Sequence, residues 1–194
     1  MPKETKDKLL DSTLSLIDKK PFHQISTKEI AEESGVAEVT LFRHFTNKES
    51  ILEILTNKFF KMIVGFETRK IDSEEKFRTE LVQYFGRTTK SNPLSRRLFK
   101  IFLYIGMYRK KTFFKYAVIY ESQIAGPIEQ IVDYGKKHWG YREEIDTDIV
   151  VKLLLNSIGF FNIIHNVFLL KESKPYDFEK IIEIGVDNFL RSLR

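Results

Sequence analysis

The sequence predicts an all-α protein with two domains, an N-terminal three-helix helix-turn-helix domain and a C-terminal helical bundle. Apolar residues recur at three- and four-residue spacing through most of the 194-residue chain, which is the period of an amphipathic helix. Helix-capping patterns stand at the starts of several of these stretches. Only five prolines and nine glycines interrupt them, and a hydrophobic content of 42% is enough for a sizeable core.

Turn signals between the apolar stretches set the boundaries of about nine helices. Pro21 ends the first, Ser73 caps a helix after a loop, and Pro93 suits a first helical turn. Gly126-Pro127 should kink a long helix, because proline has no amide hydrogen to donate. The expected helices span residues 3–19, 27–33, 38–44, 48–68, 74–88, 93–107, 112–137, 146–170 and 177–191. The domains are then 1–47, a connecting helix at 48–70, and 71–194.

The segment from Ile25 to Ile51 carries the most specific pattern in the chain. Ser26 and Glu29 form a capping box, in which each side chain bonds a backbone N–H of the first helical turn. Gly35 is placed to take the left-handed conformation that ends this helix. A second short helix follows, and the spacing of Thr46 and Glu49 repeats the capping-box pattern before a third. Two short helices joined by a glycine-containing turn form a helix-turn-helix.

The segments 27–36, 40–45 and 47–49 resemble the DNA-binding region of the TetR-like (TetR/AcrR) bacterial transcriptional regulators. The match covers about a quarter of the chain, and length and helical layout agree over the remainder. The resemblance implies a one-component regulator, usually a repressor, that binds double-stranded DNA at a pseudo-palindromic operator as a homodimer. The two recognition helices would lie in successive major grooves about 34–36 Å apart. The motif alone leaves open a buried helical corner with no DNA role.

The DNA-facing candidates are residues that the small core does not use. Arg43 suits a base edge, because its planar guanidinium can pair bidentately with guanine, although a phosphate contact is the alternative. Glu38 suits the helix dipole but repels phosphates, Ala37 cannot cap the recognition helix, and Phe42 lacks a hydroxyl for a phosphate. His23, which has no spaced partner, is interpreted as a surface residue. The complete DNA-binding set is Thr27, Lys28, Ala37, Glu38, Val39, Thr40, Phe42, Arg43, His44 and Lys48.

The charge distribution does not by itself indicate DNA binding. The chain has a formal net charge of +5, yet residues 1–50 contain 8 Lys and Arg against 9 Asp and Glu. There is no cysteine, which excludes disulfides and Cys-based zinc sites. The sequence shows neither a signal-peptide pattern nor an apolar stretch of membrane-spanning length. We therefore expect a cytoplasmic protein with no metal, cofactor or membrane partner.

The segment from Leu81 to Tyr120 contains no Asp or Glu and interleaves nine cations with ten aromatic residues. In the simplest interpretation the cations cover outer faces while the aromatics fill a core. The alternative is a pocket for an apolar or amphipathic small-molecule effector with an anionic head, such as an acyl compound. Contact with DNA phosphates is a third use of these cations. The pocket candidates are Phe59, Tyr84, Phe102, Tyr104, Tyr108, Phe113, Tyr116, Tyr120, Phe161 and His165.

The last two expected helices are too apolar to be covered easily by one chain. Residues 146–170 are apolar on nearly all sides, and Ile184 lies off the main apolar stripe of the final helix. We expect them to pair with their copies in a homodimeric four-helix bundle, with Gly159 and Gly185 permitting close approach. An entirely intrachain core is the alternative.

Together these patterns predict a ligand-responsive transcription regulator rather than an enzyme. The competing class is a small helical-bundle enzyme that acts on an apolar ligand. The sequence has no His-Glu-x-x-His, no Glu-x-x-His pair, no phosphate-cradling glycine loop and no cysteine nucleophile. A non-specific DNA-compacting protein is a second competitor, and the slightly acidic first domain disfavours it.

Overall fold

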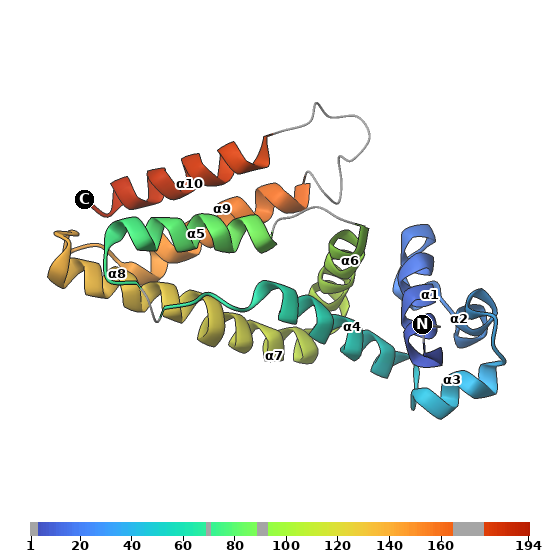
Figure 1. The fold of residues 1–194 in the computed structure, drawn as a ribbon. Coiled ribbons are helices and arrows are strands. Elements are labelled where there is room, and N and C mark those ends of the chain that lie inside the picture. The colour runs from blue at the N-terminus through green and yellow to red at the C-terminus, as the bar shows by residue number, and fades with distance from the viewer. Residues whose placement is uncertain (1–3, 69–70, 89–92, 165–176) are drawn as a thin grey trace. The chain divides into compact units, whose positions relative to one another are not determined.

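The computed structural model describes residues 4–68, 71–88, 93–164 and 177–194, and every regular element in these ranges is helical. The chain divides into two compact units. The head unit consists of residues 1–61 and 92–113, and the bundle unit consists of residues 62–91 and 114–194. Figure 1 shows the labelled helices. The all-α prediction is confirmed.

Two short helices and two longer ones build the core of the head unit. These are α1 (Thr5–Lys19), α2 (Thr27–Ser34), α3 (Glu38–His44) and α4 (Lys48–Ile63), with a 3-10 turn, η1 (Phe22–Gln24), after α1. Their apolar faces meet in a core in which Val36 is only half-buried. The fully buried side chains include Leu9, Leu10, Phe22, Ile25, Ile30, Leu41, Phe45, Ile51 and Leu55.

Local signals set the helix starts of the head unit. Ser26 and Glu29 form the predicted capping box, and Gly35 takes the left-handed conformation at φ 70° that ends α2. Hydrogen bonds from Lys20 and Ser26 lower the pKa of Glu29 to about 2, so the box is fully charged at neutral pH. The residue that caps α4 is Asn47 rather than the predicted Thr46. Its Oδ1 accepts a hydrogen bond from the Ser50 backbone amide at 2.9 Å.

Helix α6 (Pro93–Tyr108) belongs to the head unit, although the predicted domain boundaries assigned residues 71–194 to a single second domain. Asp18 of α1 accepts hydrogen bonds from Arg97 at 2.6 Å and from Lys100 at 3.1 Å. The Tyr104 ring lies edge-on to Phe22 with centroids 5.6 Å apart, and the exposed His23 stacks on Tyr104 at 6.1 Å. Helix α6 thus packs on α1 through both ion pairs and rings.

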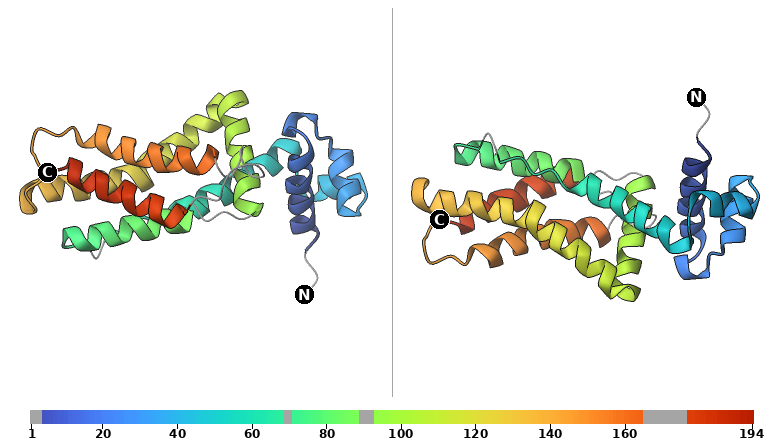
Figure 2. Two further views of the ribbon diagram at one scale, coloured as in Figure 1. Left: turned by 90° about the horizontal axis from the view of Figure 1, so that it is seen from above. Right: turned by 90° about the horizontal axis from the view of Figure 1, so that it is seen from below.

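The bundle unit is built from α5 (Glu74–Thr88), α8 (Gly126–His138), α9 (Thr147–Ile163) and α10 (Phe178–Ser192). Helix α10 packs along both α5 and α9, as the two views of Figure 2 show. The Arg78 guanidinium of α5 bonds both carboxylate oxygens of Asp187 of α10, at 2.6 and 3.2 Å. The core includes Phe77, Leu81, Ile128, Val132, Val151, Leu155, Ile182, Val186 and Leu193.

A π-helical turn joins α7 (Lys110–Tyr120) to α8, so that residues 110–138 form one continuous helical segment. The turn spans Glu121–Ala125 and stands immediately before Gly126-Pro127. A proline ring collides with the carbonyl four residues earlier in a regular α-helix, and a π turn widens the backbone there. The predicted irregularity is therefore present as a local π turn. Counted as continuous segments, the described α-helices number nine.

One predicted helix end differs from the structure, and another lies outside the described residues. Helix α4 ends at Ile63 rather than at residue 68, because Gly65 has φ 116° and Phe66 turns into the core of the bundle unit. A positive φ of this kind is compatible with glycine and breaks the helical hydrogen-bond pattern. The predicted helix 146–170 is described as far as Ile163, and residues 165–170 lie outside the described ranges.

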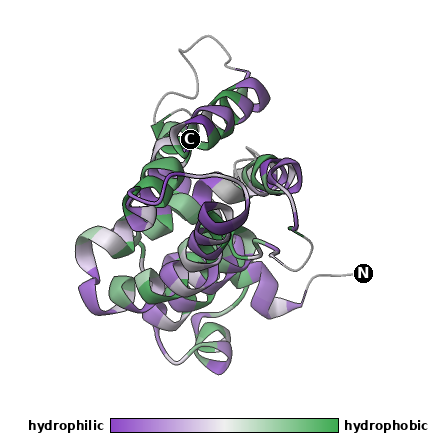
Figure 3. Ribbon diagram, turned by 90° about the vertical axis from the view of Figure 1, so that its left-hand side faces the viewer, coloured by the Kyte–Doolittle hydropathy of each residue, from purple (hydrophilic) through white to green (hydrophobic). Residues whose placement is uncertain are grey.

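The helices carry apolar and polar residues on different faces, and Figure 3 shows green and purple segments alternating along them. None of the helices in the described ranges combines the length and the hydropathy that a bilayer crossing requires.

Candidate nucleic-acid interface

Helix α3 turns one face into the head core and the other toward solvent. Leu41 and Phe45 are buried, at 0% and 2% exposure, whereas Val39, Phe42 and Arg43 are exposed. At about 100° per residue, Val39 and Arg43 lie nearly opposite the buried Leu41, and Phe42 lies on one flank. The helix therefore presents a short outward stripe that the core does not use.

Glu38 at the start of α3 has a partner within the head unit. The Thr27 hydroxyl donates to its Oε1 at 2.6 Å, which joins the first turns of α2 and α3. Ala37 makes no side-chain cap, as expected, and the Glu38 carboxylate supplies negative charge at the helix start instead. Two predicted DNA-facing residues, Thr27 and Glu38, therefore bind each other.

Lys48 is held by the backbone of the head unit. Its ammonium donates to the carbonyl oxygens of Phe22, His23 and Ile25 at 3.2, 3.4 and 2.8 Å, and lies 4.9 Å from the centroid of the Phe22 ring. Burial lowers the pKa of Lys48. These three bonds use all three ammonium donors, so a phosphate contact would require breaking one of them. The sequence pattern gave no indication of this role, because the acceptors lie 23 to 26 residues away.

The remaining DNA-facing candidates lie on the surface of the same unit. Lys28, Ala37, Arg43 and His44 are exposed, and Thr40 is half-buried. Lys28 lies 3.9 Å from Glu32, a spacing of one helical turn on α2. Arg43 can thus offer a planar, permanently charged fork at the end of α3 that suits a base edge or a phosphate.

Comparison with known proteins agrees with this geometry. Residues 9–55 match the family model of bacterial regulatory proteins, tetR family, and this range includes α2, the turn, α3 and half of α4. Residues 9–55 therefore carry the DNA-binding region typical of the TetR family. A segment of 54 residues is 41% identical to an uncharacterized HTH-type transcriptional regulator, YvkB, of Bacillus subtilis (strain 168). That match spans 28% of this chain and 29% of the length of YvkB.

Solved structures of similar fold extend over nearly the whole chain. PfmR, a TetR family transcriptional regulator from Thermus thermophilus, has a TM-score of 0.70 at 16% identity, covering 96% of this chain and 98% of its own. MexZ, a repressor of Pseudomonas aeruginosa, has a TM-score of 0.73 at 15% identity, covering 98% and 94%. The fatty acid degradation regulator FadR from Bacillus halodurans has a TM-score of 0.69 at 18% identity, covering 100% and 98%. At these identities the likeness concerns the fold.

The predicted pocket residues fall into both units. Phe59, Phe102, Tyr104, Tyr108 and Phe113 belong to the head unit, where the Phe59 and Phe102 rings stack at 5.3 Å and Tyr108 is 61% exposed. In the bundle unit, burial raises the pKa of Tyr120 to about 12, and burial also raises the pKa of Tyr84. Tyr116 is fully buried and Phe161 is half-buried. His165 lies outside the described residues.

The bundle unit carries an open groove of about 560 Å³ between α9 and α10. Of the predicted pocket residues described in that unit, it includes Phe161 alone. The close approach predicted for Gly185 is made within the chain, since a Cβ there would lie 3.2 Å from Ile158 Cδ1, whereas a Cβ at Gly159 would meet no atom within 4 Å. The groove is lined by Val150, Leu153, Leu154, Ser157, Ile158, Phe161, Ile181, Ile184, Gly185, Asn188, Phe189 and Ser192.

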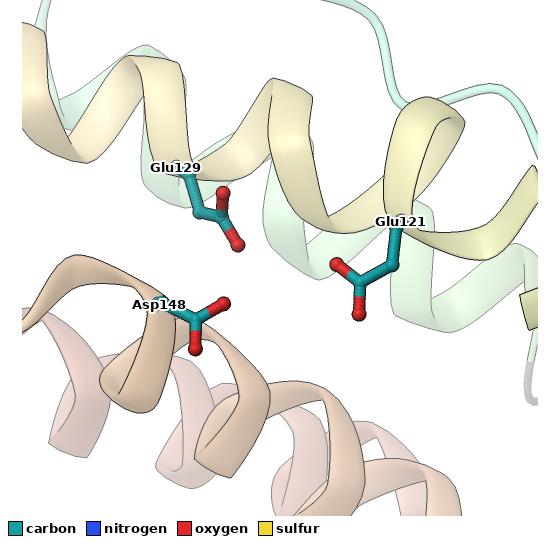
Figure 4. Close-up of side chains that lie close together, drawn as sticks. All are labelled: Glu121, Glu129 and Asp148. Atoms are coloured by element: carbon teal, nitrogen blue, oxygen red, sulfur yellow. The ribbon is translucent and has the colours of Figure 1, made fainter. Parts of the chain in front are cut away.

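Three carboxylates converge beside the π turn. Oxygens of Glu121, Glu129 and Asp148 lie within 4.8 Å of one another. Figure 4 shows the three side chains, with Asp148 facing Glu121 and Glu129 from the neighbouring helix. Lys152 forms ion pairs with Asp148 and, at 3.4 Å, with Glu121. Oε1 of Glu129 is buried without a hydrogen-bond donor, and burial together with Asp148 and Glu121 raises the pKa of Glu129. The positive charge of Lys152 thus pairs with the carboxylates of Glu121 and Asp148, whereas the negative charge of Glu129 is only weakly compensated.

Proposed function

We propose that this chain is a ligand-responsive one-component transcription repressor that binds a pseudo-palindromic operator as a dimer. The observation that carries the proposal is the outward stripe of α3, on which Val39 and Arg43 lie opposite the buried Leu41 within a helix-turn-helix whose first helix is held by a capping box. A helix presented in this way fits the major groove of B-DNA. Arg43 is proposed to contact a base edge, and Lys28, Thr40 and His44 to contact the sugar-phosphate backbone. Such a role places the protein in the cytoplasm, where bacterial DNA lies.

A dimer is proposed to form at the groove between α9 and α10. Leu153 is 63% exposed and Ile184 is 50% exposed, although both are large apolar side chains on the groove. A second copy placed on a two-fold axis would cover the same residues in both chains and form a four-helix bundle. In this proposal residues 71–194, which include α6 of the head unit, carry dimerisation and ligand binding, and residues 1–47 carry DNA binding.

The effector is proposed to be a small apolar or amphipathic molecule, with an anionic acyl compound as the first candidate. Tyr84 and Tyr120 support this proposal, because buried phenols with raised pKa values stay protonated and can donate to a carboxylate. The segment Leu81 to Tyr120 contains nine cations and no acid, and four of these cations, Arg87, Arg97, Lys100 and Arg109, pair with carboxylates from outside the segment. FadR from Bacillus halodurans, which has a similar fold, is a regulator of fatty acid degradation. Binding would release the operator by shifting the population to a form whose two α3 helices no longer fit it.

Selection from a random duplex library with the full-length protein tests the DNA-binding function. We expect enrichment of an inverted repeat and a gel-shift affinity that exceeds that for scrambled DNA by at least about 10³-fold. Mass spectrometry of molecules retained by the purified protein, followed by gel-shift titration with each, tests the effector. Equal binding to scrambled and selected DNA would overturn the operator proposal. An operator affinity that no retained or acyl compound changes would overturn ligand control.

A further inference from the structure

The exposed surface of α3 is mostly apolar. Val39 is 60% exposed and Phe42 is 51% exposed, on a helix of only seven residues. Residues three and four apart share a helix face, so that Val39 lies beside both Phe42 and Arg43. The stripe therefore joins two apolar side chains to one guanidinium.

The polar groups beside this face have other partners or proposed roles. Oε1 of the Glu38 carboxylate accepts from Thr27 at 2.6 Å, which holds the carboxylate at the N-terminal end of α3. Ala37 offers only a methyl group, Thr40 is half-buried, and the exposed His44 is proposed to contact phosphate. At Val39 and Phe42, the chemistry available for reading bases is apolar contact.

The major groove presents one apolar group that identifies a base, the C5-methyl of thymine. We propose that Val39 and Phe42 read thymine methyl groups beside the base that Arg43 contacts. The inference rests on the proposed function and adds a specificity to it. Each half-site should then contain thymines next to a guanine.

The spacing of the side chains limits where these thymines lie. Four residues separate Val39 from Arg43, which is roughly 6 Å along the helix axis. Successive bases on one strand are about 3.4 Å apart. The methyl groups should therefore fall within about two base pairs of the guanine.

Replacement of single thymines by deoxyuridine in the selected operator tests the inference, because it removes the methyl group and keeps the base pair. We expect about a fourfold loss of affinity for each methyl that is read, which corresponds to about 0.8 kcal/mol. The Val39→Ala and Phe42→Ala variants should each lose the sensitivity at one thymine and keep it at the other. His44→Ala, on the same helix and at a proposed phosphate contact, is the control: it should weaken binding to every operator alike and keep the deoxyuridine sensitivity at both thymines. A cytosine replaced by 5-methylcytosine at a non-contacted position controls for effects on duplex stability.

The outcomes separate this inference from the proposed function. Operator binding with no deoxyuridine effect, or with an effect that Val39→Ala and Phe42→Ala both retain, overturns methyl reading and leaves the regulator intact. Failure to enrich any sequence overturns both. Because Val39 and Phe42 are exposed, both variants should unfold at the same urea midpoint as the parent protein, and this measurement excludes misfolding as the cause of a lost effect.

Discussion

The Thr27 hydroxyl donates a 2.6 Å hydrogen bond to the Glu38 carboxylate, and this contact joins the N-terminal ends of α2 and α3. Both helix starts carry partial positive charge, and a carboxylate placed between them is stabilised by it. The contact also fixes α2 against α3 and so orients the outward stripe of Val39 and Arg43. The same carboxylate repels DNA phosphates. Glu38 therefore stabilises the arrangement of α2 and α3 but lowers the affinity for DNA.

Glu38→Gln should raise operator affinity several-fold at low salt. The amide keeps an oxygen that can accept from Thr27 but removes the negative charge from the proposed DNA face. Because salt screens exposed charges over about 10 Å at 0.1 M, the gain should shrink as the salt concentration rises. Gel-shift titration at several salt concentrations measures it. Glu144→Gln removes the same charge from an exposed site in the bundle unit and should change little, and equal gains from both variants would contradict the prediction.

Arg43→Ala should weaken operator binding by about 1–3 kcal/mol and relax base preference at one position in each half-site. Arg43→Lys keeps the charge but loses the planar fork, so it should restore part of the affinity and little of the base preference. Repeating the selection with each variant measures both quantities. An unchanged base preference in Arg43→Ala would assign the side chain to phosphate contact.

Lys48→Gln should destabilise the head unit by about 1.5–3 kcal/mol, the range for hydrogen bonds that involve a charged group. The variant removes an ammonium that bonds the carbonyl oxygens of Phe22, His23 and Ile25. Urea unfolding followed by circular dichroism measures the loss. The matched control is Lys28→Gln, in which the ammonium is exposed and its nearest carboxylate oxygen, on Glu32, is 3.9 Å away. A Lys48 variant as stable as the control would show that the three bonds contribute nothing.

Glu129→Gln should raise stability at neutral pH and reduce its dependence on pH. Burial, Asp148 and Glu121 raise the pKa of Glu129 in the folded chain above the ordinary value of 4.5, so the folded state binds its proton more tightly than the unfolded state. The contribution of this group to the free energy of unfolding therefore falls as pH rises from the ordinary value through the raised one, and then levels off. Urea midpoints from about pH 4 to about pH 8 measure the effect.

The exposed Glu143 provides the control for this measurement. Glu143→Gln should leave the shape of the stability curve unchanged. A Glu129→Gln curve that runs parallel to that of the parent protein would mean that Glu129 ionises without cost in the folded state.

Leu153→Glu should convert the proposed dimer to a monomer. A carboxylate on each copy would meet its symmetry mate at an apolar two-fold interface, where an unpaired buried charge is costly. Sedimentation velocity at micromolar concentration measures the state. Val118→Glu changes another exposed apolar residue, on α7 and outside the groove, and should leave the dimer intact. A parent protein that sediments as a monomer would refute the dimer itself.

Most helix starts in this chain could be predicted, because their signals lie within a few residues. Ser26 with Glu29, Ser73 and Pro93 stand at or immediately before observed helix starts. The ends were harder to predict. Helix α4 stops at Ile63 because Phe66 is buried in the bundle core, and no local pattern reports where a distant core lies.

In the candidate nucleic-acid interface, the exposed residues could be predicted from the sequence but their hydrogen-bond partners could not. The exposure of Arg43 and Phe42 followed from the helical period, since Leu41 and Phe45 occupy the core side. The partners of Lys48 and Glu38 did not follow, because a side chain's choice among carbonyls, hydroxyls and phosphates depends on which of them the fold brings near.

The helical class and the helix-turn-helix follow from local sequence, since capping, turn and periodicity act over a few residues and need no distant partner. The tertiary structure alone decided that α6 belongs with the head, that Lys48 holds η1, and that Thr27 holds Glu38. These contacts join residues 11 to 82 positions apart, and only the packed core fixes which such pairs meet.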